Sequence, residues 1–183
     1  MIFPDFGRRR ALFALVACGA APVSMACTPT ARDALGPFYK PGMAEAGDIC
    51  RSARGARLRV EGVVTGMPDC RPLAGAVVDV WQADGAGEYT LVDANRRDDR
   101  DCLLRGIVKT DAEGRYAFLA VMPGEYPGRP RHIHYRVSAP GHRTLVTQAY
   151  FAPERGVAPS LVGRLTRDGE QSILRFDITL ARS

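Results

Sequence analysis

The sequence predicts an all-β protein, an antiparallel β-sandwich with long irregular loops, and three observations lead to that prediction. Several segments alternate apolar and polar side chains with a period of two, which is typical of half-buried strands. Turns rich in glycine and proline separate these segments. No segment shows a convincing amphipathic helical period. Short strands joined by turns favour two antiparallel sheets packed face to face.

At least seven short strands are expected between Leu58 and Leu180. They are Leu58–Thr65, Ala76–Gln82, Ile107–Thr110, Arg115–Ala120, His132–Ser138, Leu145–Phe151 and Ser172–Leu180. The turn Asp111–Gly114 predicts that the strands on either side of it form a hairpin with a four-residue loop. Trp81, the only tryptophan, is expected to pack in the core.

Length and charge describe an ordinary globular chain. Its 183 residues are enough for one domain with its own core. The formal net charge is +5, of which +2 lies in the first 26 residues. The remaining charge of about +3 is scattered, without a lysine cluster or an aromatic-interleaved basic stripe, so no nucleic-acid partner is predicted.

Residues 1–26 are predicted to be a cleavable signal segment. Arg8–Arg10 form a basic region before an apolar stretch that is too short to span a membrane. The Arg-Arg pair is similar to a twin-arginine export signal, and Ser24–Ala26 fits a cleavage site. Leu15–Cys18 resembles a lipoprotein box, which makes Cys18 a candidate for a lipid anchor. The protein is therefore expected to be exported, either to the periplasm or as a membrane-anchored lipoprotein.

Cysteine number supports export. Four cysteines follow the signal segment, at positions Cys27, Cys50, Cys70 and Cys102. An even number suits two disulfides in an oxidising compartment, and the sequence leaves all three pairings open. Residues 27–56 are predicted to be an N-terminal loop arm, and residues 57–183 the sandwich domain. The arm contains Leu35–Tyr39, a stiff Gly-Pro bend followed by two aromatic residues.

Two of the three histidines form the most informative motif, His132-Ile133-His134. On a strand both imidazoles share one face and Ile133 points into the core. The nearby oxygen donors are phenols, Tyr126 and Tyr89, rather than paired carboxylates. Phenolate and imidazole together favour Fe(3+) on charge and hardness. Two phenolates and a hydroxide would neutralise that ion, which makes a buried charge tolerable.

At this point the chain resembles the intradiol ring-cleavage dioxygenases, a family that includes catechol and protocatechuate dioxygenases. An ordered series of short stretches carries the resemblance from about residue 29 to 151. These stretches are Leu35–Tyr39, Pro72–Ala76, Val80–Ala83, Gly87–Tyr89, Arg105–Gly106, Thr110–Tyr116, Pro123–Tyr126, Arg129–His134 and Thr147–Phe151. Each stretch is weak alone, but their order and spacing are specific.

The resemblance implies a non-haem ferric site held by Tyr89, Tyr126, His132 and His134. It also implies that a small aromatic diol binds the iron and that O2 cleaves its ring between the two hydroxylated carbons, giving a cis,cis-muconate. Tyr126 would take up a substrate proton, and Arg129 would steady negative charge on the ring. Gln148 matches a pocket glutamine of the family. The particular catechol stays open, and so does an oligomeric state.

Two other classes of function are also considered. A non-catalytic sandwich module, such as a carbohydrate-binding or adhesion domain, would keep the scaffold without iron or colour. A zinc hydrolase using His132 and His134 would need a third histidine or a carboxylate, and none stands out nearby. The two tyrosines separate the dioxygenase hypothesis from both.

Overall fold

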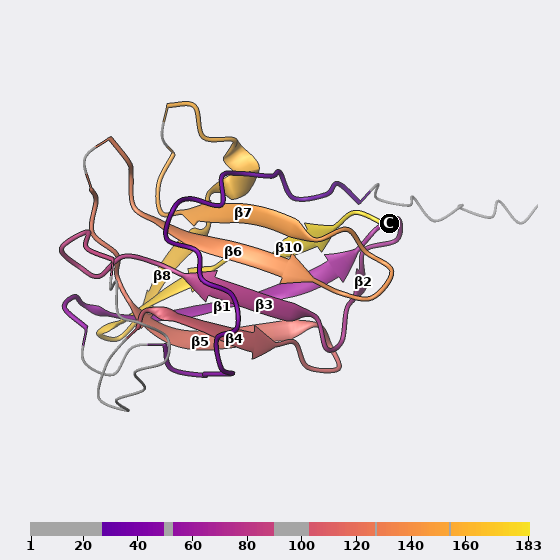
Figure 1. Ribbon diagram of the computed structural model, residues 1–183, viewed down its shortest axis with the longest axis horizontal. Coiled ribbons are helices and arrows are strands. Elements are labelled where there is room, and N and C mark those ends of the chain that lie inside the picture. Colours follow the sequence, from indigo (N-terminus) through magenta and orange to yellow (C-terminus); the bar gives the residue numbers. More distant parts are fainter. Residues whose placement is uncertain (1–26, 50–52, 90–102, 127, 154) are drawn as a thin grey trace, which may run out of the picture.

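The computed structural model describes residues 27–49, 53–89, 103–126, 128–153 and 155–183. Two β-sheets lie face to face, as Figure 1 shows. The predicted β-sandwich is therefore confirmed. The predicted signal segment, Cys50 and Cys102 lie outside the described residues.

The four-stranded sheet has the order β4-β3-β6-β7, and all three of its pairings are antiparallel. Its strands are β3 (Val77–Trp81), β4 (Arg105–Lys109), β6 (His132–Ser138) and β7 (Leu145–Tyr150). Along β6, Ile133, Tyr135 and Val137 are buried against the other sheet. The alternate residues of these strands face outwards, away from the core.

The six-stranded sheet is organised around the long strand β1, which pairs with β2, β5, β9 and β10. Its strands are β1 (Arg57–Gly66), β2 (Arg71–Pro72), β5 (Arg115–Val121), β8 (Arg164–Asp168), β9 (Gln171–Arg175) and β10 (Ile178–Leu180). A short 3-10 helix, η1 (Pro159–Leu161), precedes β8. Alternation in β1 buries Leu58, Val60 and Val64 and turns Arg59 and Glu61 outwards.

The predicted hairpin across Asp111–Gly114 is wrong. The turn itself forms, because the Asp111 carboxylate accepts hydrogen bonds from the Glu113 and Arg115 amides at 3.0 and 2.7 Å. However, β4 pairs with β3 in one sheet and β5 pairs with β1 in the other. The turn therefore carries the chain between the layers, which period-two alternation cannot distinguish from a hairpin.

The predicted strand Ser172–Leu180 is divided into β9 and β10, which both run parallel to β1. The break lies at Asp177, whose carboxylate accepts the Val63 amide of β1 at 3.0 Å. A side chain thus replaces a backbone acceptor in the ladder. The sandwich is mostly antiparallel, with these two parallel pairings beside β1.

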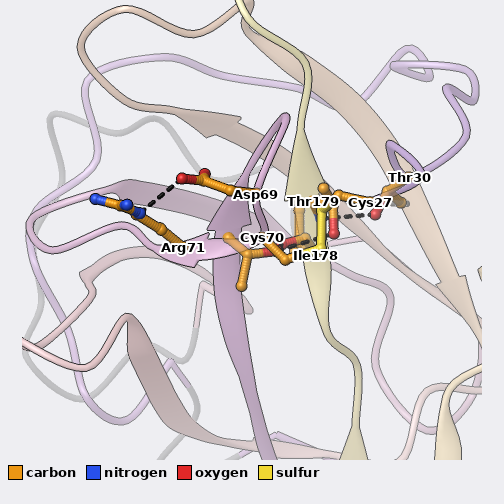
Figure 2. Close-up of a disulfide and its surroundings, with 8 residues drawn as sticks. Cys27, Thr30, Asp69, Cys70, Arg71, Ile178 and Thr179 are labelled. Atoms are coloured by element: carbon orange, nitrogen blue, oxygen red, sulfur yellow. Dashed lines mark hydrogen bonds and ion pairs between the residues drawn. A yellow bond between two sulfur atoms is a disulfide. The ribbon is translucent and has the colours of Figure 1, made fainter. Parts of the chain in front are cut away.

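The described part of the arm, residues 27–49 and 53–56, contains no helix or strand. Figure 1 shows it, in indigo, crossing the outer face of the four-stranded sheet. The Cys27–Cys70 disulfide fixes its beginning to the turn before β2, as Figure 2 shows. Thr30 adds two hydrogen bonds to Thr179 of β10, one through its amide and one through its hydroxyl. Among the described residues, no helix is long and apolar enough to cross a membrane.

Candidate metal centre

His132 and His134 lie side by side on the outer face of β6, at the end where the strand begins. Their Nε2 atoms are 3.1 Å apart. His132 donates its Nδ1 proton to the Pro130 carbonyl at 2.7 Å, which leaves a lone pair on Nε2. Two nitrogen ligands at right angles, each about 2.1 Å from one metal ion, would be about 3.0 Å apart. The observed spacing of the two nitrogens therefore fits neighbouring ligands of a single ion.

Tyr89 and Tyr126 lie in two loops whose backbones are in direct contact. Gly87 has φ +84°, and a Cβ added to it would lie 2.3 Å from the Glu125 carbonyl oxygen. A Cβ added to Gly124 would lie 2.5 Å from the Gly87 nitrogen, and Gly124 donates its own amide to the Asp84 carbonyl at 2.7 Å. Because glycine alone allows this contact, the two Gly-Glu-Tyr sequences place both tyrosines next to each other.

The four predicted ligands form a closed group of aromatic rings. The Tyr89 and Tyr126 rings are 6.0 Å apart, and Tyr126 is 5.7 Å from His132. His132 is 4.7 Å from His134, and His134 is 6.3 Å from Tyr89. Residues from three separate parts of the chain thus meet within one small volume.

The burial of these side chains suits a cation. Burial lowers the pKa of His132, and it lowers the pKa of His134 to about 3, with the charges of His132 and Arg129 adding to the effect. Both imidazoles are therefore neutral at physiological pH. Burial, followed by the neighbouring Tyr126, raises the pKa of Tyr89, whose hydroxyl has no hydrogen-bond partner among the described residues. A phenol in that position ionises only beside a strong positive charge.

The candidate donor set contains no carboxylate or thiolate. Among the described residues, no group of three or more acidic, cysteine and histidine side chains could hold an ion. The candidate centre instead combines two histidines with two tyrosines. The residues present fit a hard, highly charged ion such as Fe(3+), for which phenolate oxygen is a suitable ligand.

Arg129 and Gln148 are in direct contact beside the two histidines. Arg129 donates from Nη2 to the Gln148 carboxamide oxygen at 2.5 Å. Gln148 pairs across the sheet with His134 and donates from Nε2 to the Ala34 carbonyl at 2.7 Å. The structure thus brings together all six residues that the sequence singled out.

Known proteins show what family this combination of fold and residues belongs to. A family model described as "Dioxygenase" matches residues 35–177, which is most of the chain. A 6-chlorohydroxyquinol 1,2-dioxygenase from Cupriavidus pinatubonensis is 33% identical over 175 residues, covering 79% of this chain. The chain belongs to the intradiol ring-cleavage dioxygenase family. The matched region extends further towards the C-terminus than the stretches quoted above.

Other members show how this chain compares in length and shape. A hydroxyquinol 1,2-dioxygenase from Nocardioides simplex is 34% identical and covers 80% of this chain. The chain spans 62% of the length of each of these two curated relatives. The solved dioxygenase domain of a dioxygenase carbohydrate-binding protein fusion from Streptomyces sp. SirexAA-E superposes with a TM-score of 0.75 at 33% identity. It covers 85% of this chain and 100% of that domain.

Within this dioxygenase fold, the floor of the site is a row of four buried side chains that crosses the sheet. Arg105, Trp81, His134 and Gln148 face outwards from β4, β3, β6 and β7 and are in register with one another. Each is at most 7% exposed. Trp81 is buried, as predicted, at 1% exposure, although it does not belong to the cluster of core residues between the two sheets. Its ring is buried on the opposite face of the sheet, where it stacks on His134 at 4.9 Å with an angle of 4°.

The arm covers this row, and each of its four members contacts a different arm residue. Gln148 binds the Ala34 carbonyl, as described above, and Arg105 donates to the Phe38 carbonyl at 3.1 Å. Tyr39 packs on Trp81 at 4.8 Å. Gly36 lies so close to His134 that an added Cβ would be 2.9 Å from the imidazole. Phe38 also stacks on Tyr89 at 4.1 Å.

Sequence reasoning missed several residues that shape the site. The bend Leu35–Tyr39 was expected to supply apolar cover, and its aromatic content was the available signal. Nothing in the sequence marked Asp33. Tyr150 lies within the quoted stretch Thr147–Phe151, but no role was predicted for it, although it lies 5.8 Å from His132 and hydrogen-bonds to Asp33. Their roles depend on a long-range contact that period and motif do not reveal.

Proposed function

We propose that the protein is an Fe(3+)-dependent dioxygenase that cleaves the ring of a catechol-type substrate between its two hydroxylated carbons, giving a cis,cis-muconate. One observation carries the proposal. Two neutral imidazoles present their Nε2 atoms to each other beside a buried phenol that has no partner among the described residues. An ion held by Tyr89, Tyr126, His132 and His134 would satisfy all three groups.

Each ligand contributes something different to such a site. His132 and His134 supply lone pairs without a proton having to leave, since burial keeps them neutral. Tyr89 and Tyr126 must each lose a proton, and their two negative charges offset most of the charge of a trivalent ion. The hydrogen bond from His132 to Pro130 fixes which nitrogen faces the ion.

The two tyrosines differ in how firmly they are held. Phe38 stacks on the Tyr89 ring, which has the arm above it. Among the described residues, the Tyr126 ring lies at a steep angle to Tyr89 and His132 and is stacked on no other ring. We infer that Tyr126 is the ligand that gives way to the substrate. Its phenolate oxygen would take up one proton from an incoming catechol, and the hydroxide that balances the charge of the ion would take up the other.

Arg129 and Gln148 would act on the substrate rather than on the ion. The positive charge of Arg129 lies close enough to help lower the pKa of both histidines. A catechol that binds as a dianion brings negative charge to the same place, so the guanidinium would stabilise that charge. Bound ferric iron would withdraw electron density from the catecholate and make its ring carbons reactive towards O2.

The decisive experiment is an anaerobic titration of the iron-loaded protein with several catechols. Tyrosinate bound to Fe(3+) absorbs visible light, so binding is followed as a change in that band, and O2 is then admitted. We expect a coloured protein and a muconate product from at least one of catechol, a hydroxylated catechol or protocatechuate. A semialdehyde product would mean that the ring is cleaved at a different bond, and would contradict the proposal.

A pair of tyrosine variants tests the ligand assignment. Tyr89→Phe should lose iron or shift the visible band, because it removes one phenolate. Tyr135→Phe is the matched control: Tyr135 is also buried and its hydroxyl also has no partner among the described residues, but it faces the core. The control should keep both iron and colour. A wild-type protein that remains colourless and retains no iron would favour the non-catalytic binding module.

We also propose that the protein is exported. The Cys27–Cys70 disulfide supports this, because such bonds persist in oxidising compartments. Mass spectrometry of the mature protein from its host would show whether the chain begins after Ala26 or carries a lipid on Cys18. Recovery of the full-length chain from the cytoplasm would contradict export.

A further inference from the structure

Tyr150 is a buried residue at the candidate site that the proposed ligand set does not use. It ends β7, directly opposite His132 in the sheet register, and its ring lies 5.8 Å from that imidazole. It is 4% exposed. Its hydroxyl lies within hydrogen-bond distance of three side chains: Asp33 at 2.9 Å, Gln148 at 3.0 Å and Arg129 at 3.2 Å.

The polarity of this network follows from counting protons. A tyrosine hydroxyl donates one hydrogen bond, and the Asp33 carboxylate is the strongest acceptor within its reach. Its oxygen is then free to accept from Nη2 of Arg129. Asp33 itself is held in place, because its other carboxylate oxygen accepts the Ala34 amide at 2.6 Å. The chain of contacts thus runs from a fixed carboxylate, through Tyr150, to the guanidinium.

Gln148 is the second side chain that accepts a hydrogen bond from Arg129. Its Nε2 donates to the Ala34 carbonyl, so its carbonyl oxygen must face Nη2 of Arg129. One nitrogen of the guanidinium therefore has two acceptors, Gln148 and Tyr150. Within the described residues, Nε and Nη1 of Arg129 have no hydrogen-bond acceptor, which leaves them available to a ligand.

We propose that Tyr150, oriented by Asp33, is a positioning residue that fixes the Arg129 guanidinium so that its remaining donors meet the negatively charged oxygens of a bound catecholate. This inference rests on the proposed function and goes beyond it, because Tyr150 touches neither the ion nor the substrate. It acts through Arg129. The arm takes part in substrate binding in the same way, since Asp33 belongs to it.

The test compares substrate affinity with iron content. In the iron-loaded Tyr150→Phe variant, the iron content and the visible band without substrate should equal those of the wild type, because no ligand is lost. The anaerobic dissociation constant for catechol should rise about tenfold, since a hydrogen bond that orients a charged donor is lost. Under air, kcat/KM should fall by a similar factor, mainly through KM.

Variants of Asp33 test the same hydrogen-bond network by changing a residue of the arm and leaving the sheet unchanged. Asp33→Ala removes the acceptor and should weaken catechol binding as Tyr150→Phe does. Asp33→Asn keeps an acceptor for the hydroxyl and should stay within about twofold of the wild type. Tyr135→Phe, a buried tyrosine on the core face, controls for the general loss of a buried hydroxyl. Thermal unfolding of each variant shows whether it is folded.

Three outcomes would contradict the inference. If Tyr150→Phe binds catechol like the wild type while Arg129→Ala does not, Arg129 acts without Tyr150. If Tyr150→Phe loses iron together with affinity, its role is to support the metal site rather than to position Arg129. If Asp33→Ala behaves like the wild type, the arm does not orient the hydroxyl. Failure of the proposed function is seen separately, as a wild-type protein that neither binds nor cleaves any catechol.

Discussion

The two outer faces of the sandwich are built from strands with the same alternation, yet they differ in burial and in what their polar side chains contact. On the four-stranded sheet, the row from Arg105 to Gln148 is buried beneath the arm. On the six-stranded sheet, outward-facing charged residues such as Arg59 and Glu61 are partly exposed around a hollow of about 390 Å³. One face carries buried polar groups that need specific partners, and the other carries charges that water can solvate.

The ion pairs on the open face show the contrast clearly. Arg59 contacts Glu61 at 2.9 Å and Arg175 contacts Asp177 at 3.2 Å, in both cases two residues along the same strand or its extension. Such exposed pairs contribute little, because water already solvates both charges. On the covered face, Gln148 and Arg105 bind carbonyl groups of the arm instead. The two faces therefore differ because the arm covers only one of them, and the candidate site is formed by the arm and the sheet together.

Breaking the anchor of the arm should have the largest effect. The Cys27–Cys70 disulfide closes a loop with a sequence separation of 43 residues, so Cys70→Ser should lower the free energy of unfolding by about 4 kcal/mol. The same change should weaken iron retention, since the arm covers His134 and Tyr89. Urea unfolding and iron analysis measure the two effects. A destabilised variant that keeps its full iron content would show that the arm stays in place without the disulfide.

A change at the contact between the tyrosine loops should have an intermediate effect. Gly87→Ala adds a Cβ that would lie 2.3 Å from the Glu125 carbonyl, at a φ of +84°. We expect the free energy of unfolding to fall by about 2–4 kcal/mol and the protein to lose iron, because Tyr89 and Tyr126 are forced apart. The matched control is Gly141→Ala, with φ +73° and nothing within 4 Å of the added atom. It should cost only about 1 kcal/mol and keep iron. Equal effects in both variants would mean that strain alone, and not the contact, matters.

A change on the open face should have the smallest effect. Glu61→Gln removes one partner of an exposed ion pair with Arg59, so the free energy of unfolding should change by about 0–1 kcal/mol. Catechol affinity and iron content should not change. If Glu61→Gln weakened substrate binding, the two faces would be coupled through β1, and the division drawn between them would be wrong.

Sequence patterns predicted the parts of the molecule that depend on local alternation. Period two found the strands, and it correctly placed Ile133 in the core between two outward-facing histidines. It failed where the partner of a strand had to be known. The turn at Asp111 satisfies its own hydrogen bonds whether it joins neighbours or crosses between layers, so the hairpin could not be distinguished from a crossing. The strand β8 was also missed, because its five residues are all exposed.

The candidate site could be predicted as far as its motif residues, and no further. Tyr89, Tyr126, Arg129 and the histidine pair were recognisable from their order and neighbours. Trp81 was correctly predicted to be buried, but the prediction did not say which side of its sheet it faces. Asp33 and Tyr150 lie 117 positions apart in the chain, and only the docking of the arm beside β7 brings them together.

The crossing of the arm also fixes an order of assembly. The arm precedes every described strand in the chain, but the residues it lies against are spread from β3 to β7. Asp33 donates its amide to Val146, which is the second residue of β7, so this docking has to wait until most of the chain has been made. A segment that precedes every described strand is therefore among the last to dock, and the histidine pair stays uncovered until it does.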